Sequence, residues 1–339
     1  MIIYKCRLGD DRVADKEKKL RFLFLLFLIS FYFVANYYFE KPQEEIQKVE
    51  LRETSPVIQE EKKENLEVKD EVKSNNKNNV ETDASGAGLK IYFVDVGQAD
   101  CILISNNGKY VLIDAGNNDD GKKLVSYFKS LGVQNFQYVI GTHAHEDHIG
   151  GMDDIIYNFS ISHFFMPDVV TTTKTFEDVL DALEAKNIAF ETPNINDSFT
   201  MGDIYFTVLW VGHDKTDLND TSIVVRATYK ETSYLFMGDA PSQVEKGLLD
   251  KHIESDLLKV GHHGSQYSSS AQFLKKVDPK YAIIQVGRNN IYSHPKQVVL
   301  DKLNRMDVKV YRTDQDGTII VSSDGKNMKF DTVQTDTNG

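Results

Sequence analysis

The sequence predicts an α/β domain over residues 89–332. Three observations support this prediction: apolar runs of strand length alternate with helical patterns, Gly, Asn and Asp residues separate them, and apolar residues make up 41% of the 339-residue chain. The expected strands lie at residues 90–96, 101–104, 110–113, 138–141, 204–211, 222–229, 233–237, 257–260, 281–285 and 318–321. The expected helices lie at residues 121–131, 175–185, 241–250 and 295–306.

An apolar run at residues 22–39 contains no charged residue. As a helix it would extend about 27 Å, which nearly spans a bilayer. Basic residues outnumber acidic ones in the preceding segment, residues 1–21, so the positive-inside rule predicts a cytoplasmic N-terminus. A cleaved signal peptide is the alternative, but no small-residue cleavage site follows the run. We expect a single-pass anchor in the cell membrane, with the α/β domain outside the cell.

Residues 40–88 contain thirteen acidic and eight basic residues and no aromatic one. Such a segment cannot bury enough apolar surface to offset the entropy of ordering the chain. We therefore expect a flexible charged linker between the anchor and the domain, and a short tail at residues 333–339. A short coiled coil in the linker is the alternative, but no heptad pattern persists.

The composition excludes several classes of protein. The net charge is −12 and the isoelectric point is near 5.3, which is the wrong sign for binding nucleic acid through overall charge. Cys6 and Cys101 are the two cysteines of the chain, so a disulfide framework or a zinc site of four thiolates is excluded. A phosphate-bearing substrate would need a local positive feature, such as bound metal ions.

A dense group of metal-ligand residues follows the strand expected at 138–141. The segment is Thr142-His-Ala-His-Glu-Asp-His-Ile-Gly-Gly151. Because side chains alternate along an extended chain, a strand-to-helix turn can aim two pairs of ligands into one pocket: His143 with His145, and Asp147 with His148. The segment therefore offers ligands to two adjacent cations. Its two terminal glycines are expected to let the backbone turn sharply.

The histidine segment resembles the metallo-β-lactamase superfamily. Residues 89–330 as a whole resemble the branch typified by the nuclease domain of the competence channel protein ComEC. The further motifs that carry this resemblance are Val94-Asp-Val-Gly-Gln-Ala-Asp100, Val111-Leu-Ile-Asp-Ala-Gly116, Asn219-Asp-Thr-Ser-Ile-Val-Val225, Phe236-Met-Gly-Asp239, Val260-Gly-His-His-Gly-Ser265 and Asn290-Ile-Tyr-Ser-His-Pro295. The resemblance implies an αββα four-layer sandwich.

The resemblance also implies a site for two divalent metal ions. His143 and His145 would hold the first ion, and Asp147 and His148 would hold the second. Asp239, at the end of an apolar strand, would bridge the two, since a carboxylate has an oxygen for each ion.

Four other residues complete the expected site. One of His262 and His263 would bind the second ion; we prefer His262 because it comes first off its strand, and alternation along the strand turns His263 away. Asp220, which directly follows Asn219, is a candidate oxygen ligand of the first ion. An oxygen ligand there would shift the preference from zinc toward manganese. Asp114 would orient the histidine segment through hydrogen bonds.

Direct catalytic roles are expected for Asp147 and His294. His294 is a candidate transition-state stabiliser or leaving-group acid, and the alternative is that it caps the helix that Pro295 begins. Asp95, Gln98 and Asp100 are expected to shape the loop beside the site.

The expected activity is metal-dependent hydrolysis by a hydroxide that two cations activate, with zinc or manganese as cofactor. The resemblance favours a phosphodiester substrate and a DNA nuclease. The alternatives are an esterase for phosphocholine-type phosphodiesters at the cell surface, a β-lactam or thioester hydrolase, and a non-catalytic binding module that has kept a metal fold. The oligomeric state is not determined by the sequence.

Overall fold

Side chains of the first strands alternate between two apolar layers. On β1 (Leu89–Phe93), Ile91 and Phe93 face one layer and Tyr92 faces the other. On β2 (Cys101–Asn106), Ile102 and Leu103 divide in the same way. This period of two is that of a strand buried on both faces, so β1 and β2 lie in the interior of the domain.

The structure is a computed structural model that describes residues 88–213 and 217–334. The N-terminal segment 1–21, the anchor expected at 22–39 and nearly all of the linker expected at 40–88 lie outside the described residues. Most of the tail expected at 333–339 lies outside them too. Within the described ranges, no helix has both the length and the apolar character needed to cross a membrane.

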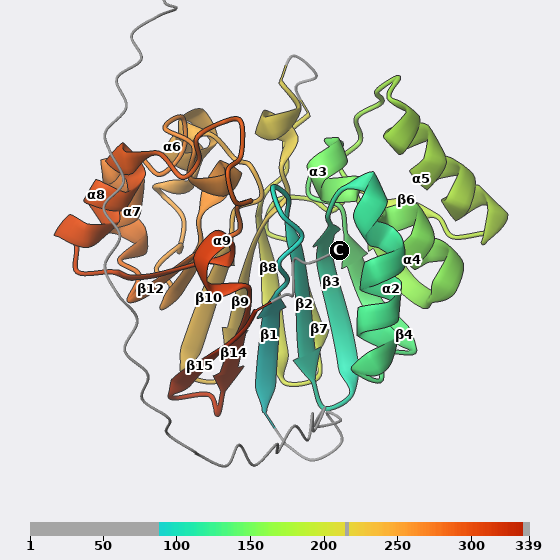
Figure 1. Ribbon diagram of the computed structural model, residues 1–339, viewed down its shortest axis with the longest axis horizontal. Helices are drawn as coiled ribbons and strands as arrows, with labels where there is room; N and C mark the ends of the chain where they lie inside the picture. Colours follow the sequence, from blue (N-terminus) through green and yellow to red (C-terminus); the bar gives the residue numbers. More distant parts are fainter. Residues whose placement is uncertain (1–87, 214–216, 335–339) are drawn as a thin grey trace, which may run out of the picture. The chain divides into compact units, whose positions relative to one another are not determined.

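Two sheets form the centre of the domain (Figure 1). The first sheet has the order β15-β14-β1-β2-β3-β4-β5-β6. Its other strands are β3 (Lys109–Ala115), β4 (Asn135–Ile140), β5 (Ser160–Phe165), β6 (Phe190–Glu191), β14 (Thr318–Ser323) and β15 (Met328–Val333). The second sheet has the order β13-β12-β11-β10-β9-β8-β7. Its strands are β7 (Ser198–Met201), β8 (Ile204–Trp210), β9 (Val224–Tyr229), β10 (Thr232–Phe236), β11 (Leu257–Lys259), β12 (Tyr281–Ile284) and β13 (Lys309–Arg312).

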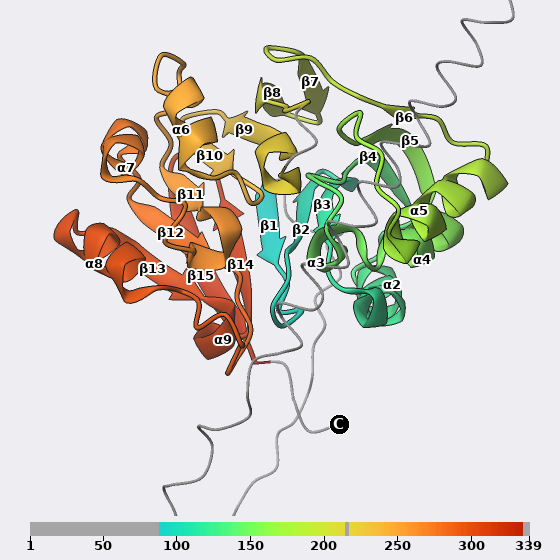
Figure 2. The same ribbon diagram turned by 90° about the horizontal axis from the view of Figure 1, so that it is seen from above.

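Helices cover the outer face of each sheet (Figure 2). The helices of the first sheet are α2 (Gly121–Ser130), α3 (Glu146–Ile149), α4 (Met152–Asn158) and α5 (Lys174–Ala185). Those of the second half are α6 (Ser242–Leu248), α7 (Ala271–Val277), α8 (Gln297–Arg305) and α9 (Thr313–Asp316). Three short 3₁₀ turns are η2 (Asn118–Asp120), η3 (Leu218–Thr221) and η4 (Gly261–Gly264).

Three apolar clusters separate the four layers. One lies between the first sheet and its helices, one between the two sheets, and one between the second sheet and its helices. Phe128 belongs to the first cluster, Phe236 to the second and Leu274 to the third. The predicted αββα sandwich is therefore confirmed for the described part of the chain.

Every strand and helix expected within residues 89–332 overlaps an observed one, and α4 follows the histidine segment, where a strand-to-helix turn is expected. The strands β5, β6, β7, β13 and β15 and the helices α7 and α9 lie outside the expected elements, and all of these strands except β5 are at a sheet edge. The outer strand β15 exposes most of its residues, and β6 has only two residues. Edge strands of this kind have only a weak hydrophobic alternation, because they bury little of either face.

The topology brings several loops to one end of the two sheets. β3 and β4 are parallel, and so are β10, β11 and β12. Parallel strands place their carboxyl ends at the same edge of a sheet, where α/β proteins hold their ligands. The histidine segment follows β4, Asp239 follows β10, and His262 and His263 follow β11.

Candidate metal centre

The histidine segment joins β4 to α3. β4 ends at Ile140, the chain bends at His143 and Ala144, and α3 begins at Glu146, directly after His145. His143 is fully buried, and its Nε2 lies 3.0 Å from Nδ1 of His145. Two ring nitrogens therefore meet at one point, as two ligands of a single cation would.

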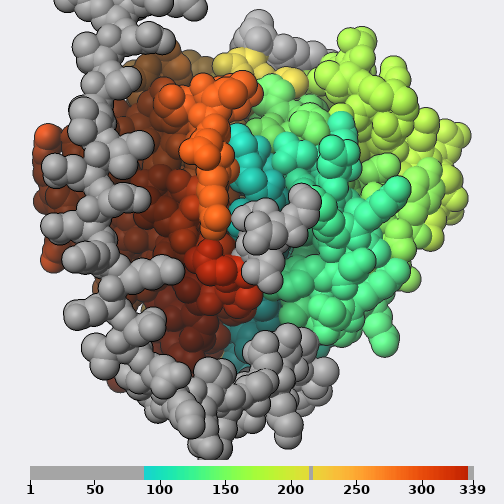
Figure 3. All heavy atoms as spheres, in the orientation of Figure 1, coloured from blue at the N-terminus to red at the C-terminus, as the bar shows by residue number. Residues whose placement is uncertain are grey.

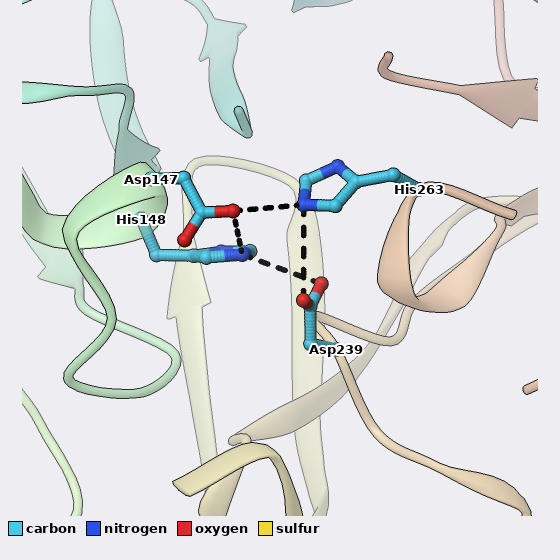
Figure 4. Close-up of side chains that lie close together, drawn as sticks. All are labelled: Asp147, His148, Asp239 and His263. Atoms are coloured by element: carbon cyan, nitrogen blue, oxygen red, sulfur yellow. Dashed lines mark hydrogen bonds and ion pairs between the residues drawn. The ribbon is translucent and has the colours of Figure 1, made fainter. Parts of the chain in front are cut away.

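A second group of ligands combines three parts of the chain (Figure 4). Asp147 and His148 come from α3, Asp239 follows β10, and His263 lies in η4, with all four ligand atoms within 4.8 Å of one another. Nε2 of His263 lies 3.2 Å from Oδ2 of Asp147, and Nε2 of His148 lies 3.3 Å from Oδ1 of Asp239. Residues separated by more than a hundred positions thus converge on one centre.

The polar atoms at this centre fit a cation. Nε2 of His148 and Oδ1 of Asp239 are buried and have no well-formed hydrogen bond, although they face each other. An unpartnered buried polar atom is costly, because it gives up hydration without replacement. A divalent ion between imidazole nitrogens and carboxylate oxygens removes this cost, and such donors suit zinc or manganese.

The doublet His262 and His263 differs from the expectation. β11 ends at Lys259, and both histidines have a positive φ, 51° and 50°, in the turn η4. Strand alternation does not apply in a turn of this kind, so both rings approach Asp239, with Nε2 atoms 3.6 and 3.7 Å from its Oδ2. His263, and not the expected His262, belongs to the four-residue centre, and His262 lines the adjoining cavity.

Asp114 connects the histidine segment to the sheet. It is buried at the end of β3, and its carboxylate accepts hydrogen bonds of 2.8 Å from the backbone N–H and the hydroxyl of Thr142. The same carboxylate lies 2.8 Å from Nδ1 of His148. With Nδ1 held in this way, His148 presents Nε2 to the centre.

Gly150, near the end of the segment, lies where the backbone is closely packed. Gly150 has helical angles, φ −56° and ψ −47°, so the sharp turn that we expected is not what requires it. A Cβ at this position would meet the backbone of Asn117 and Asn118, and would lie 2.6 Å from the carbonyl oxygen of Glu146. Gly150 therefore allows α3 to lie directly against the loop that follows β3.

The structure separates Asn219 from Asp220. Asn219 lines the cavity beside the centre, and its Oδ1 is buried without a hydrogen-bond partner among the described residues. The Asp220 carboxylate turns toward Gln243 of α6 and does not line the cavity. Of the two neighbours, Asn219 is the one that lines the cavity.

A cavity of about 620 Å³ lies over the centre, and it has His262, His294 and Tyr292 in its wall. Burial, together with the neighbouring His262, lowers the pKa of His294 to about 4. Two large side chains of this wall are exposed, Ile291 at 90% and Tyr292 at 56%. In Figure 3 an orange segment of the second half of the domain lies against the cyan and green first half.

Carboxylates set the charge of the imidazoles. Burial by itself would lower the pKa of His263, but the carboxylates of Asp239 and Asp100 outweigh burial and raise it to about 10. Burial acts against the charge of His148 as well, and Asp239 and Asp114 raise its pKa well above the usual value. At pH 7 these two rings therefore carry protons that a metal ion must displace.

Binding of Zn²⁺ or Mn²⁺ to the full chain at pH 7 is expected to release protons, and the affinity is expected to fall as the pH is lowered. The pKa of His148 and of His263 is raised, so metal binding exchanges for protons, and a higher proton concentration shifts this exchange against the metal ion. Calorimetry in two buffers of different ionisation enthalpy measures the number of protons released. His163→Ala is the control, because His163 pairs with Glu191 and lies outside the centre. Equal heats in the two buffers would contradict the prediction.

Lys259 is a residue of the site that the sequence pattern did not predict. Its side chain is fully buried at the end of β11, and Nζ lies 2.6 Å from Oδ2 of Asp100, directly behind His263. The available signal was a lysine within the otherwise apolar strand expected at 257–260, which is an unusual position for an unpaired charge.

Comparisons with known proteins agree with this geometry. A family model described as the metallo-beta-lactamase superfamily matches residues 94–288. "ComE operon protein 3" of Bacillus subtilis (strain 168) is 31% identical over 252 residues, which are 68% of this chain and 32% of that protein. "Competence protein ComA" of Neisseria gonorrhoeae is 26% identical over 231 residues, which are 66% of this chain and 31% of that protein. These relatives confirm the resemblance to the competence-protein branch.

The chain spans about a third of the length of these curated relatives. Among solved structures, the metallo-beta-lactamase fold protein YhfI from Bacillus subtilis matches with a TM-score of 0.48 and 13% identity. That match covers 70% of this chain and 100% of the solved chain.

Proposed function

Because the chain belongs to the metallo-beta-lactamase superfamily, whose model matches residues 94–288, we propose that it is a metal-dependent phosphodiesterase that cleaves a nucleic-acid strand. The observation that carries the proposal is the centre itself. Imidazole and carboxylate atoms that lack partners of their own converge at the floor of an open cavity. Such a centre suits hydrolysis without a nucleophilic side chain.

The residues divide between two cation positions. His143 and His145 would hold one ion, and Asp147, His148 and His263 the other, with Asp239 between them. When bound, two divalent ions lower the pKa of a shared water from 15.7 toward about 7 and offset charge on the phosphoryl oxygens.

The residues of the cavity wall act on the substrate. Asp147 is 29% exposed, so its carboxylate both faces the centre and reaches the cavity, where it can orient the attacking water. His294 lies farther out, with its ring centroid 5.8 Å from that of His262. We assign to His294 a hydrogen bond to the phosphoryl group or to the leaving oxygen.

The cavity wall favours a nucleic-acid strand as the substrate. No lysine or arginine is among the residues that line this cavity in the described part of the chain, so the cations themselves must bind the phosphate. Tyr292 offers an exposed aromatic ring at the rim, and unpaired bases stack on such rings. A single strand exposes the faces of its bases, whereas a duplex buries them. The name of one relative, "Competence protein ComA", refers to competence and supports the same substrate class.

The proposed location is the outer face of the cell membrane. Residues 22–39 would be the single-pass anchor, the segment 40–88 the tether, and the hydrolase domain would lie outside. A protease added to intact cells should then degrade the domain. A domain that survives in intact cells and is degraded only after lysis would contradict this location.

A substrate panel tests the activity. The purified full chain is assayed with single-stranded DNA, duplex DNA, RNA, a choline phosphoester and bis(p-nitrophenyl) phosphate, each with Mn²⁺ and with Zn²⁺. We expect single-stranded nucleic acid to give the highest kcat/KM, and His145→Ala to abolish turnover. Preference for the choline phosphoester would favour the esterase, and metal binding without any turnover would favour a binding module.

A further inference from the structure

We propose that Asp100 and Lys259 form a buried positioning pair that orients the His263 ring so that Nε2 binds a metal ion. This inference rests on the proposed function only in requiring a metal ion at the centre. It concerns two residues that lie behind the centre and outside the cavity wall. Neither residue can touch a substrate, so they are positioning residues.

The pair is enclosed by the protein. Lys259 is 0% exposed and Asp100 is 1% exposed, in the layer between the two sheets. Nζ of Lys259 lies 2.6 Å from Oδ2 of Asp100 and also donates a hydrogen bond of 3.0 Å to the carbonyl oxygen of Val260. The backbone N–H of Asp100 donates a hydrogen bond of 3.0 Å to the carbonyl oxygen of Asp147. The pair thus connects β11 to α3, which carries the ligand Asp147.

The other oxygen of Asp100 faces His263. Oδ1 of Asp100 lies 3.3 Å from Nδ1 of His263, and the backbone carbonyl of Gln285 lies 3.0 Å from the same nitrogen. Both neighbours are acceptors, so Nδ1 must carry a proton. In the neutral ring Nε2 then has a free lone pair, and it points at Asp147 and Asp239. Second partners of this kind hold a ligating histidine in one tautomer and one orientation.

Lys259 explains how Asp100 can remain charged. Asp100 is a buried carboxylate that lies near Asp114 and close to a centre that already contains Asp147 and Asp239. An unpaired buried charge costs several kcal/mol. Without a positive partner, the Asp100 carboxylate would therefore become protonated or would repel the neighbouring carboxylates. A lysine, fully buried and at 2.6 Å, supplies the missing positive charge on the side away from the metal ligands.

If the ion pair of Asp100 and Lys259 had only a structural role, the double variant would be expected to behave differently. Replacing both members of a buried pair by neutral residues of similar shape is often close to neutral for stability, whereas removing one member leaves an unpaired charge. If the pair only stabilises the fold, the double variant should keep its metal affinity. If it positions His263, the double variant should fold and still bind metal more weakly.

The test compares the wild-type full chain with the double variant D100N/K259M. Affinity for Zn²⁺ and Mn²⁺ is measured by competition with a chromophoric chelator, without any substrate. We expect affinity to fall by about 10- to 100-fold. The visible spectrum of the Co²⁺-loaded protein should also change, because the geometry around the ion changes. The matched control is D256N/K280M, which removes the ion pair of 2.9 Å at the opposite end of β11. This control should leave both measurements unchanged.

Wild-type affinity and an unchanged Co²⁺ spectrum in D100N/K259M would overturn the proposal. If that variant shows no cooperative unfolding transition, ¹⁵N NMR of the Zn²⁺-loaded wild-type chain decides instead. His263 should then bind zinc through Nε2 and keep its proton on Nδ1, and binding through Nδ1 would overturn the proposal. A wild-type chain that binds metal and hydrolyses no phosphodiester would refute the proposed function alone, because none of these measurements requires turnover.

Discussion

Asp239→Asn is expected to reduce kcat for phosphodiester hydrolysis by on the order of 10³-fold, which corresponds to about 4 kcal/mol of barrier. Asp239 is 2% exposed, and its two oxygens face different partners: Oδ1 faces His148, and Oδ2 faces His262 and His263. An amide keeps the shape of the side chain but offers one weak oxygen ligand instead of two charged ones. The substitution therefore removes the carboxylate that would bridge the two proposed cation positions.

The measurement is single-turnover hydrolysis of the best substrate of the panel at saturating metal concentration, together with metal stoichiometry. We expect the stoichiometry to fall along with the rate. The matched control is Asp250→Asn, since Asp250 is exposed and does not line the cavity over the centre. A variant at position 239 that keeps full activity and full metal content would refute the proposed centre.

Gly150→Ala is expected to destabilise the folded state by about 3 kcal/mol or more and to weaken metal binding at the same time. The added methyl group would meet backbone atoms on two sides, those of Asn117 and Asn118 and the carbonyl of Glu146. Backbone segments cannot move aside as a flexible side chain can. To make room, α3 must shift, and it carries Asp147 and His148.

Urea unfolding with and without Zn²⁺ measures both effects. Gly247→Ala is the control, because Gly247 is exposed in the helix α6 and a Cβ there would lie 2.8 Å from the far end of the Trp210 side chain, which can turn, and would meet no backbone atom. The same chemical change at this position should alter stability by less than about 1 kcal/mol, since alanine favours helix. An alanine at position 150 that leaves both stability and affinity unchanged would show that α3 does not depend on this close approach.

The histidine segment could be predicted because its ligand residues are close together in the sequence. His143, His145, Asp147 and His148 lie within six residues, and their spacing after a strand limits where they can point. Most strands in the interior of the two sheets could be predicted for the same reason, since alternation of side chains is visible in a buried strand. The strands β5, β6, β7, β13 and β15 could not.

The doublet at 262 and 263 shows where this reasoning stops. Strand alternation gives opposite directions to neighbours, but these two residues have a positive φ and follow the strand. Such angles depend on what packs around the turn, and the backbone N–H of His262 donates a hydrogen bond of 3.1 Å to the carbonyl of Gly238. Which of the two histidines belongs to the centre therefore depends on contacts with the loop that precedes Asp239, and these contacts are visible only in the structure.

By itself, the sequence determined the layered α/β architecture and the types of ligand in the centre, because periodicity and chemically dense segments are properties of neighbouring residues. The tertiary structure decided which atoms of those ligands meet, why Gly150 must lack a side chain, and that Lys259 neutralises Asp100 behind His263. These features join residues such as Asp100 and Lys259, which are 159 positions apart. Their physical origin is burial: a charge or an imidazole inside a protein must find its partner in space, and sequence spacing does not record which partner that is.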